Sequence, residues 1–239
     1  MSLKETEALH KAISKAKIRN PSSDCIGPIG ETNMINGLKR VVDAEFYASC
    51  TRKPSVYRGN PFLIEAALAY GFRSNSNTDK NKKEDSDNDP VMRVSRIANR
   101  VPLLYQQSAG AIFKAVLDTN WRSYGLSQSR GALPRGPVVI MVHIASVWVP
   151  FTSESKEAIA HYPEIIKEIK LAVRECGRKL GMHVRRQKRI KQELKKRDYI
   201  KTYLPHIGEA LRDILALKDK QVDRLIERLT ETLEKSRKM

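Results

Sequence analysis

Apolar positions change their spacing along this chain, from strand-like runs in the first half to helical spacing in the second. Apolar, aromatic and β-branched residues fill 45–51, 62–71, 91–104 and 137–149 between proline and glycine stops, which predicts four strands. The last run is almost continuously apolar, as in a central strand that is buried on both faces. The sequence therefore predicts a sheet of about four strands.

Helical spacing predicts short helices over 5–16, 31–40 and 106–120, and nearly continuous helix from Ser153 onward. Thr152 and Ser153 are candidate caps for this long segment. Pro163 predicts a kink in it, Pro205 and Gly208 predict a second break, and 219–238 reads as a final helix. The predicted fold class is α+β, with a short helical segment before the sheet and a long helical arm (153–239) after it.

Residues 73–89 form a stretch rich in Ser, Asn, Asp and Lys. Such a composition cannot bury enough apolar surface to offset the entropy of ordering. The sequence therefore predicts a disordered insert between the second and third strands.

The charge balance is the strongest compositional signal. A net charge of +17 and a pI near 9.9 indicate a polyanionic partner, most often nucleic acid. No apolar run reaches the roughly 18 to 20 residues of a membrane span, and the polar N-terminus is unlike a signal peptide. Three separated cysteines indicate a reducing compartment without a disulfide framework or zinc site. An intracellular protein that contacts nucleic acid is expected.

Basic residues concentrate between Arg174 and Lys201, where twelve stand against three acidic ones. On a helix they would cover most of the circumference and attract phosphate by counterion release. Arg185, Arg186, Lys188 and Arg189 form the densest run and are the candidate DNA contacts. A solvated helix face without a partner, or an arm that docks on another subunit, would also explain the pattern.

Two shorter segments carry candidate chemistry. Trp121, Arg122 and Tyr124 place two aromatic rings around a cation, which suits contact with a DNA backbone, although such a pair is more often a core anchor. Lys156 follows a strand and a run of hydroxyl residues, and is expected in the first turn of a helix. A cation there opposes the helix dipole and sometimes marks an anion site.

Catalytic and nucleotide-binding motifs are missing from the sequence. The five histidines have no metal-ligand spacing to Cys, Asp or Glu, so each is expected to be structural or exposed, and no metal site is predicted. Neither G-x-G-x-x-G nor G-x-x-x-x-G-K-[ST] is present. By chemistry alone, nothing makes this chain an enzyme by itself.

Several longer motifs occur in a fixed order along the chain. They are DCIGPIGE at 24–31, RKP at 52–54, GNPF at 59–62, ANRVPLLY at 98–105, VHIAS at 142–146 and VPFTSESKEAI at 149–159. In this order they resemble one protein family, the B subunit of type IIB DNA topoisomerases (topoisomerase VI). The similarity runs from about residue 18 to about residue 210.

The resemblance implies an organisation in two parts. Residues 1–40 would be the end of a helix-two-turn-helix domain, and 41–239 a transducer domain with a left-handed βαβ crossover and a long C-terminal helix. That helix would lead towards the DNA-cleaving A subunit. The family's ATP-binding domain has no counterpart in this sequence, so the chain alone is expected to be inactive and to bind no cofactor.

The resemblance also assigns roles to residues. Lys156 matches the lysine that contacts the terminal phosphate of ATP, and a lysine ammonium suits a movable phosphate sensor. Trp121-Arg122-Ser123-Tyr124 is similar to a Trp-Lys-x-Tyr stretch implicated in DNA contact. Arginine in place of lysine keeps the charge and changes the hydrogen-bond geometry.

The implied function is to relay ATP binding to the A subunit while one duplex passes through another. The full assembly would use ATP and Mg²⁺ and contain double-stranded DNA, the topoisomerase VI A subunit, and a second B subunit, without a membrane. It would be DNA-associated, in the nucleoid or the nucleus. The alternatives are a basic RNA-binding protein of ribosomal type and a non-enzymatic DNA-binding scaffold for a cleavage subunit.

Overall fold

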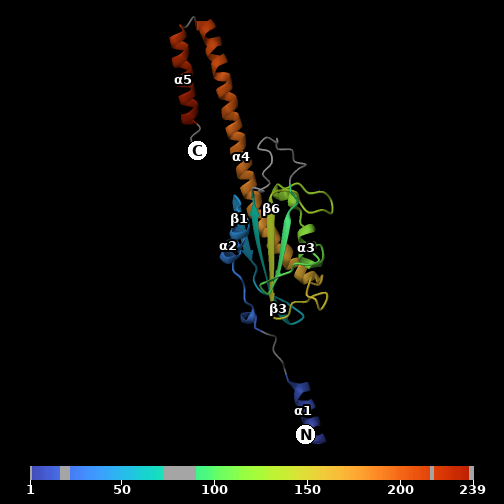
Figure 1. Ribbon diagram of the computed structural model, residues 1–239. Coiled ribbons are helices and arrows are strands. Elements are labelled where there is room, and N and C mark those ends of the chain that lie inside the picture. The colour runs from blue at the N-terminus through green and yellow to red at the C-terminus, as the bar shows by residue number, and fades with distance from the viewer. Residues whose placement is uncertain (1, 17–21, 73–89, 216–217, 237–239) are drawn as a thin grey trace. The chain divides into compact units, whose positions relative to one another are not determined.

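The computed structural model describes residues 2–16, 22–72, 90–215 and 218–236, and the predicted insert at 73–89 lies outside them. The chain divides into two compact units, Met1–Met182 and His183–Met239. The first unit holds the sheet and most of the buried core (Figure 1).

One mixed sheet forms the centre of the first unit. Its strands are β1 (Phe46–Thr51), β2 (Ser55–Tyr57), β3 (Asn60–Tyr70), β4 (Arg93–Ala98), β5 (Val101–Pro102) and β6 (Val138–Ser146). The strand order is β1-β3-β6-β4-β5, with β2 paired to β3. Strand β6 therefore occupies the middle, and eight of its nine residues are buried. This confirms the prediction of a central strand over 137–149.

Strands β4 and β6 are parallel neighbours, while every other strand pair is antiparallel. Helix α3 (Gly110–Leu117) lies between these two strands in the chain. The described residues thus contain the predicted βαβ connection, and its left-handedness stays a prediction. The single strand predicted over 91–104 is wrong, because a tight turn at Asn99 and Arg100, both with positive φ, reverses the chain into β5.

Alternation along the strands divides the core between two faces. On one face Ala67, Ala69 and Val139 pack against Met34 and Leu38 of helix α2 (Glu31–Val41). On the other, the first part of helix α4 lies against the strands (Figure 1). There the Cys176 thiol approaches the Ala66 carbonyl at 3.5 Å and Lys179 donates to the Ser49 carbonyl at 2.6 Å.

Helix α4 runs unbroken from Pro163 to Leu215, which corrects three predictions. It starts ten residues after Ser153, because proline is favoured at a first helical position, where no N–H is required. Pro163 is therefore the start of the helix and not a kink. Pro205 lies inside the helix, so the break predicted at Pro205 and Gly208 is also wrong.

The two ends of the chain are helical, as predicted. Helix α1 (Leu3–Lys15) begins with a capping box formed by Ser2 and Glu5 and has no buried residue. Helix α5 (Asp219–Ser236) packs on α4 within the second unit, where Gly208 faces Val222 and Ile226. None of the described helices is long and apolar enough to span a membrane.

Candidate functional site

Lys156 lies at the exposed tip of a loop that joins β6 to α4. The Thr152 N–H donates to the Ala158 carbonyl at 2.9 Å, and Ala160 donates to the Pro150 carbonyl at 2.8 Å, so the loop folds back on itself like a hairpin. Lys156 has φ of 54°, a left-handed backbone that non-glycine residues seldom adopt. The lysine is therefore held in a loop, and the prediction that it lies in a helical turn is wrong.

The side of this loop that leads to α4 is buried and anchored at Ala158 and Ile159. Ala158 and Ile159 are each 1% exposed, and the Ile159 carbonyl accepts from the Ala111 N–H at 2.9 Å. Gly110 has φ of 91°, and a Cβ there would lie 3.1 Å from the Ile159 nitrogen. The start of α3 thus fixes the base of the loop, while its tip, 152–156, is exposed.

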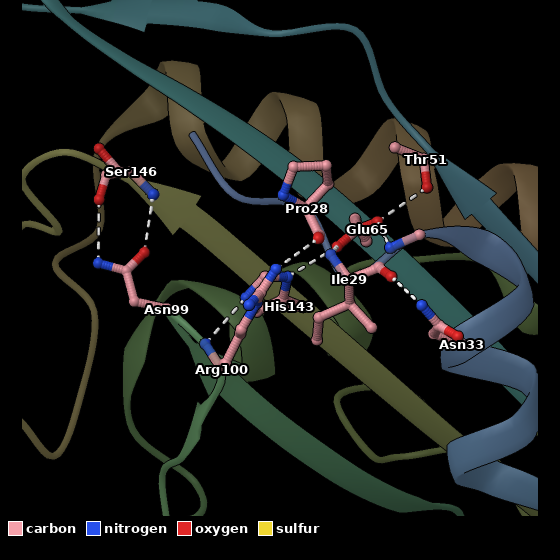
Figure 2. Close-up of polar contacts among 10 residues, drawn as sticks. Pro28, Ile29, Asn33, Thr51, Glu65, Asn99, Arg100, His143 and Ser146 are labelled. Atoms are coloured by element: carbon pink, nitrogen blue, oxygen red, sulfur yellow. Dashed lines mark hydrogen bonds and ion pairs between the residues drawn. The ribbon is translucent and has the colours of Figure 1, made fainter. Parts of the chain in front are cut away.

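The side of the loop that leaves β6 is held by a pair of hydrogen bonds between the Asn99 side-chain amide and the Ser146 backbone (Figure 2). The Asn99 side chain donates to the Ser146 carbonyl and accepts from the Ser146 N–H, both at 2.9 Å. The Ser146 hydroxyl also donates to the Pro61 carbonyl at 2.9 Å. Residue 146 ends β6, so the chain enters the loop from a position held by the β4–β5 turn and by β3.

Beneath this contact a buried pair connects the sheet to the segment before α2. Glu65 of β3 and His143 of β6 are fully buried partners across the strands, with Oε2 2.8 Å from Nδ1 (Figure 2). The same carboxylate accepts from the backbone N–H groups of Ile29 at 2.7 Å and Gly30 at 2.8 Å. Thr51 adds a fourth hydrogen bond at 3.0 Å. Glu65 therefore holds the two residues that precede α2 against the sheet.

The hydrogen bonds explain the low pKa of Glu65 and the tautomer of His143. Burial alone would raise the Glu65 pKa, but bonds from His143, the two backbone N–H groups and Thr51 outweigh it and lower the pKa to about 2. The other ring nitrogen of His143 accepts from the Arg100 N–H at 3.1 Å, so the proton lies on Nδ1. Arg100 in turn donates to the Pro28 carbonyl at 3.0 Å (Figure 2).

Sequence reasoning did not find this network, because Glu65 and His143 are 78 residues apart. The expectation that the histidines are structural or exposed holds for His143, which is structural. Among the described residues no group of three or more His, Cys, Asp or Glu side chains could hold a metal ion. The composition of β3 was the one available signal, since it places a single carboxylate within an otherwise apolar run.

The Trp121–Tyr124 segment is a short 3-10 helix after α3. Trp121 is 0% exposed and its indole N–H donates to the Val116 carbonyl at 2.8 Å. The Tyr124 ring packs against α4, where a Cβ at Gly177 would lie 2.5 Å from it. The two rings meet edge to face at 6.0 Å. Both rings hold the segment against the rest of the unit. Because the Trp121 ring is fully buried, it cannot stack on DNA in this conformation.

Arg122 remains exposed on that segment. Its Nε donates to the Gln128 carbonyl at 2.7 Å, which leaves the terminal nitrogens for other contacts. A cavity of about 400 Å³ adjoins it, and Arg130, Ser129, Asn120 and Gln128 are among its lining residues. Two arginines and several hydrogen-bonding groups make this a surface that suits a phosphate backbone.

The four candidate contacts of the basic run all belong to α4 in the second unit. Arg185, Arg186, Lys188 and Arg189 are exposed. They are followed along the same helix by further exposed cations, Lys195 and Lys196. This confirms that the run is a helical, solvent-facing surface, while its partner stays a prediction.

Comparison with known proteins gives a consistent result. Residues 21–196 match the family model described as "Topoisomerase VI B subunit, transducer". The B subunits of type 2 DNA topoisomerase 6 from Methanosarcina acetivorans and Methanococcoides burtonii are 43% and 44% identical over 211 residues, 88% of this chain and 32% of each relative. The Archaeoglobus fulgidus protein of that name is 39% identical over 229 residues, 96% of this chain and 36% of the relative. The chain thus spans about a third of the length of these relatives.

Proposed function

Because the chain belongs to the topoisomerase VI B subunit transducer family, we propose that it contacts DNA and relays ATP binding to a DNA-cleaving subunit. Relatives of about three times its length carry the name of a type 2 DNA topoisomerase subunit. The remainder of such a subunit would supply the ATP-binding domain. The partners would be double-stranded DNA, an A subunit, and a second B subunit.

The observation that carries the proposal is the position of Lys156. Its ammonium group lies at the tip of a loop that is anchored at both ends. Ser146 is held by the β4–β5 turn and β3, and Ile159 by the start of α3. Bound ATP with Mg²⁺ would present a terminal phosphate as the partner charge. A lysine is suited to this task because its flexible stem delivers a compact charge.

The loop also gives a route for the signal. Residues 147–162 join β6 directly to Pro163, the first residue of α4. A shift of the tip towards a phosphate therefore acts on the start of α4. Since α4 continues into the second unit, it is the element that would carry the displacement towards the cleaving subunit.

DNA contact is assigned to two surfaces. Arg122, beside the cavity at Gln128, would bind backbone phosphate, with Trp121 and Tyr124 positioning it. The exposed run at Arg185, Arg186, Lys188 and Arg189 would add charge-based attraction. The net charge of +17 supports a polyanionic partner for both.

The test is Lys156→Ala in the complete enzyme assembled with its A subunit. We expect ATP-dependent strand passage to be lost, because the phosphate loses its contact, while DNA binding stays unchanged. Relaxation of supercoiled DNA measures the first, and fluorescence anisotropy of a labelled duplex the second. Lys167→Ala, an exposed lysine in the first turns of α4, is the matched control and should remain active.

Normal strand passage by the Lys156→Ala enzyme would refute the sensor role. Together with retained DNA binding, it would favour the alternative of a scaffold that binds DNA without an ATP cycle.

A further inference from the structure

Gln128 lies in the loop after the Trp121–Tyr124 segment, and its side-chain amide joins three separate pieces of backbone. The amide oxygen accepts from the Trp121 N–H at 3.0 Å. The amide nitrogen donates to the carbonyls of Leu117 at 3.2 Å and Ala132 at 3.1 Å. One side chain therefore connects the end of α3, the start of the short 3-10 helix and the far side of its own loop.

These contacts use groups that the two helices cannot pair by themselves. Leu117 is the last residue of α3, and the last carbonyls of a helix have no partner within it. Asn120, which precedes the 3-10 helix, provides no side-chain cap, so Gln128 supplies the acceptor for the Trp121 N–H. A glutamine amide suits this position because it both donates and accepts hydrogen bonds.

The backbone of the same residue holds Arg122. The Arg122 Nε donates to the Gln128 carbonyl at 2.7 Å. A guanidinium that is fixed through Nε keeps both terminal nitrogens for an outside acceptor, and such a planar pair of donors matches two phosphate oxygens. A long side chain that became ordered only on binding would lose conformational entropy at that moment. The bond to Gln128 therefore orients the arginine before a phosphate arrives.

The acidic neighbour of this arginine has its own partner. Asp118 is the one carboxylate among the residues that line the adjoining cavity, and it pairs with Lys170 of α4 at 3.0 Å. Arg130, which also lines the cavity, is a second exposed cation. The charge around Arg122 therefore remains positive, which favours contact with a nucleic-acid backbone.

We propose that Gln128 is a positioning residue for the contact between Arg122 and a DNA phosphate. Its side chain holds the backbone of the loop, and the carbonyl of that backbone holds the guanidinium. This role rests on the proposed DNA contact at Arg122 and acts through that residue. Loss of the Gln128 amide should therefore weaken duplex binding only while Arg122 is present.

The experiment is a double-mutant cycle in the 239-residue chain, with duplex affinity measured by fluorescence anisotropy. Gln128→Met keeps the length of the side chain and removes all three amide contacts, so it should weaken binding several-fold. In an Arg122→Gln background the same change should have no further effect, because the residue that it positions is gone. Arg186→Gln on α4 is the matched control. Its effect should add to that of Gln128→Met, since Arg186 lies in the second unit.

A second measurement needs neither DNA nor a variant. The Arg122 Nε–H signal in a proton–nitrogen NMR spectrum should exchange slowly with water, because this N–H is bonded to the Gln128 carbonyl. The reference is Arg130, whose guanidinium has no hydrogen bond to any described residue. In Gln128→Met the Arg122 signal should exchange faster, while the unfolding temperature shows whether the variant is folded.

Two outcomes overturn the positioning role: additive losses for Gln128→Met and Arg122→Gln, or Nε–H exchange at Arg122 as fast as at Arg130 in the natural sequence. If Arg122→Gln weakens duplex binding and Gln128→Met does not, the positioning role alone is refuted. If Arg122→Gln leaves duplex affinity unchanged, the proposed DNA contact is refuted, and the role of Gln128 with it.

Discussion

Arg96 and Arg186 are the same residue type in two contrasting regions. Arg96, on β4 of the first unit, is 3% exposed and donates to the carbonyls of Leu103 at 2.9 Å, Tyr105 at 2.6 Å and Gln106 at 2.9 Å. Arg186, on α4 of the second unit, is exposed. The first guanidinium organises the loop between β5 and α3, while the second is available to an outside partner.

This contrast extends to other charged groups of the two regions. Glu65 and Lys179 of the first unit bond to backbone atoms of neighbouring elements. The run from Arg185 to Arg189 faces solvent. The same formal charge therefore stabilises the fold in one region and leaves a binding surface in the other. Substitutions should separate these roles, since the first kind should change stability and the second affinity.

The largest effect is expected at Arg96. Arg96→Met should lower the free energy of unfolding by about 3 kcal/mol, because at least three backbone carbonyls lose their charged donor. Urea unfolding followed by tryptophan fluorescence measures it. Arg93→Met, at an exposed position of the same strand, should cost less than about 1 kcal/mol. Equal losses of unfolding free energy for the two variants would contradict a structural role that is specific to Arg96.

The next effect concerns the exposed run. Replacing Arg185, Arg186, Lys188 and Arg189 with Gln should reduce duplex affinity about 100-fold at low salt. It should also lower the slope of log affinity against log salt by about 3 to 4. The unfolding free energy should change by less than about 0.5 kcal/mol. Gln at Lys4, Lys11 and Lys15 of α1 and at Arg40 of α2 removes the same four positive charges from exposed positions and is the control for net charge alone. A matching loss there would contradict a localised surface.

Glu65→Gln should lower the free energy of unfolding by about 2 kcal/mol at neutral pH, since an amide cannot accept all four hydrogen bonds. The folded-state pKa of about 2 lies below the ordinary 4.5, so the folded protein binds fewer protons in this window. The stabilisation is complete above about pH 4.5 and is lost as pH falls towards 2.

The measurement is urea unfolding of both proteins at a series of pH values. The difference between them should shrink from pH 4.5 downwards. Glu45→Gln, at an exposed position, should show neither effect. A difference that did not depend on pH would exclude the buried carboxylate as its source.

The smallest effect on duplex affinity is expected at Arg122. This residue tests the contrast directly, because it is an exposed cation within the first unit. Arg122→Gln should weaken duplex binding several-fold and lower the salt slope by about 1, without a change in stability. Lys114→Gln, exposed on nearby α3, serves as the control. A loss of stability in place of affinity would place Arg122 with the structural charges of its unit.

The sequence by itself determined the features that depend on local pattern and composition. The α+β class, the central strand at 138–146, α2, α5 and the exposed basic run followed from spacing and charge, because periodicity and solvation act on neighbouring residues. The ordered motifs also identified the family that the comparisons show.

Tertiary structure decided what depends on contacts between distant segments. Trp121 and Tyr124 lie in the core and against α4, since Gly177 opens a gap that no local pattern reveals. The loop at Lys156 replaces a predicted helix because Ile159 is bonded to the start of α3. Glu65 and His143 meet only when β3 and β6 pair, and burial then makes their hydrogen bonds essential.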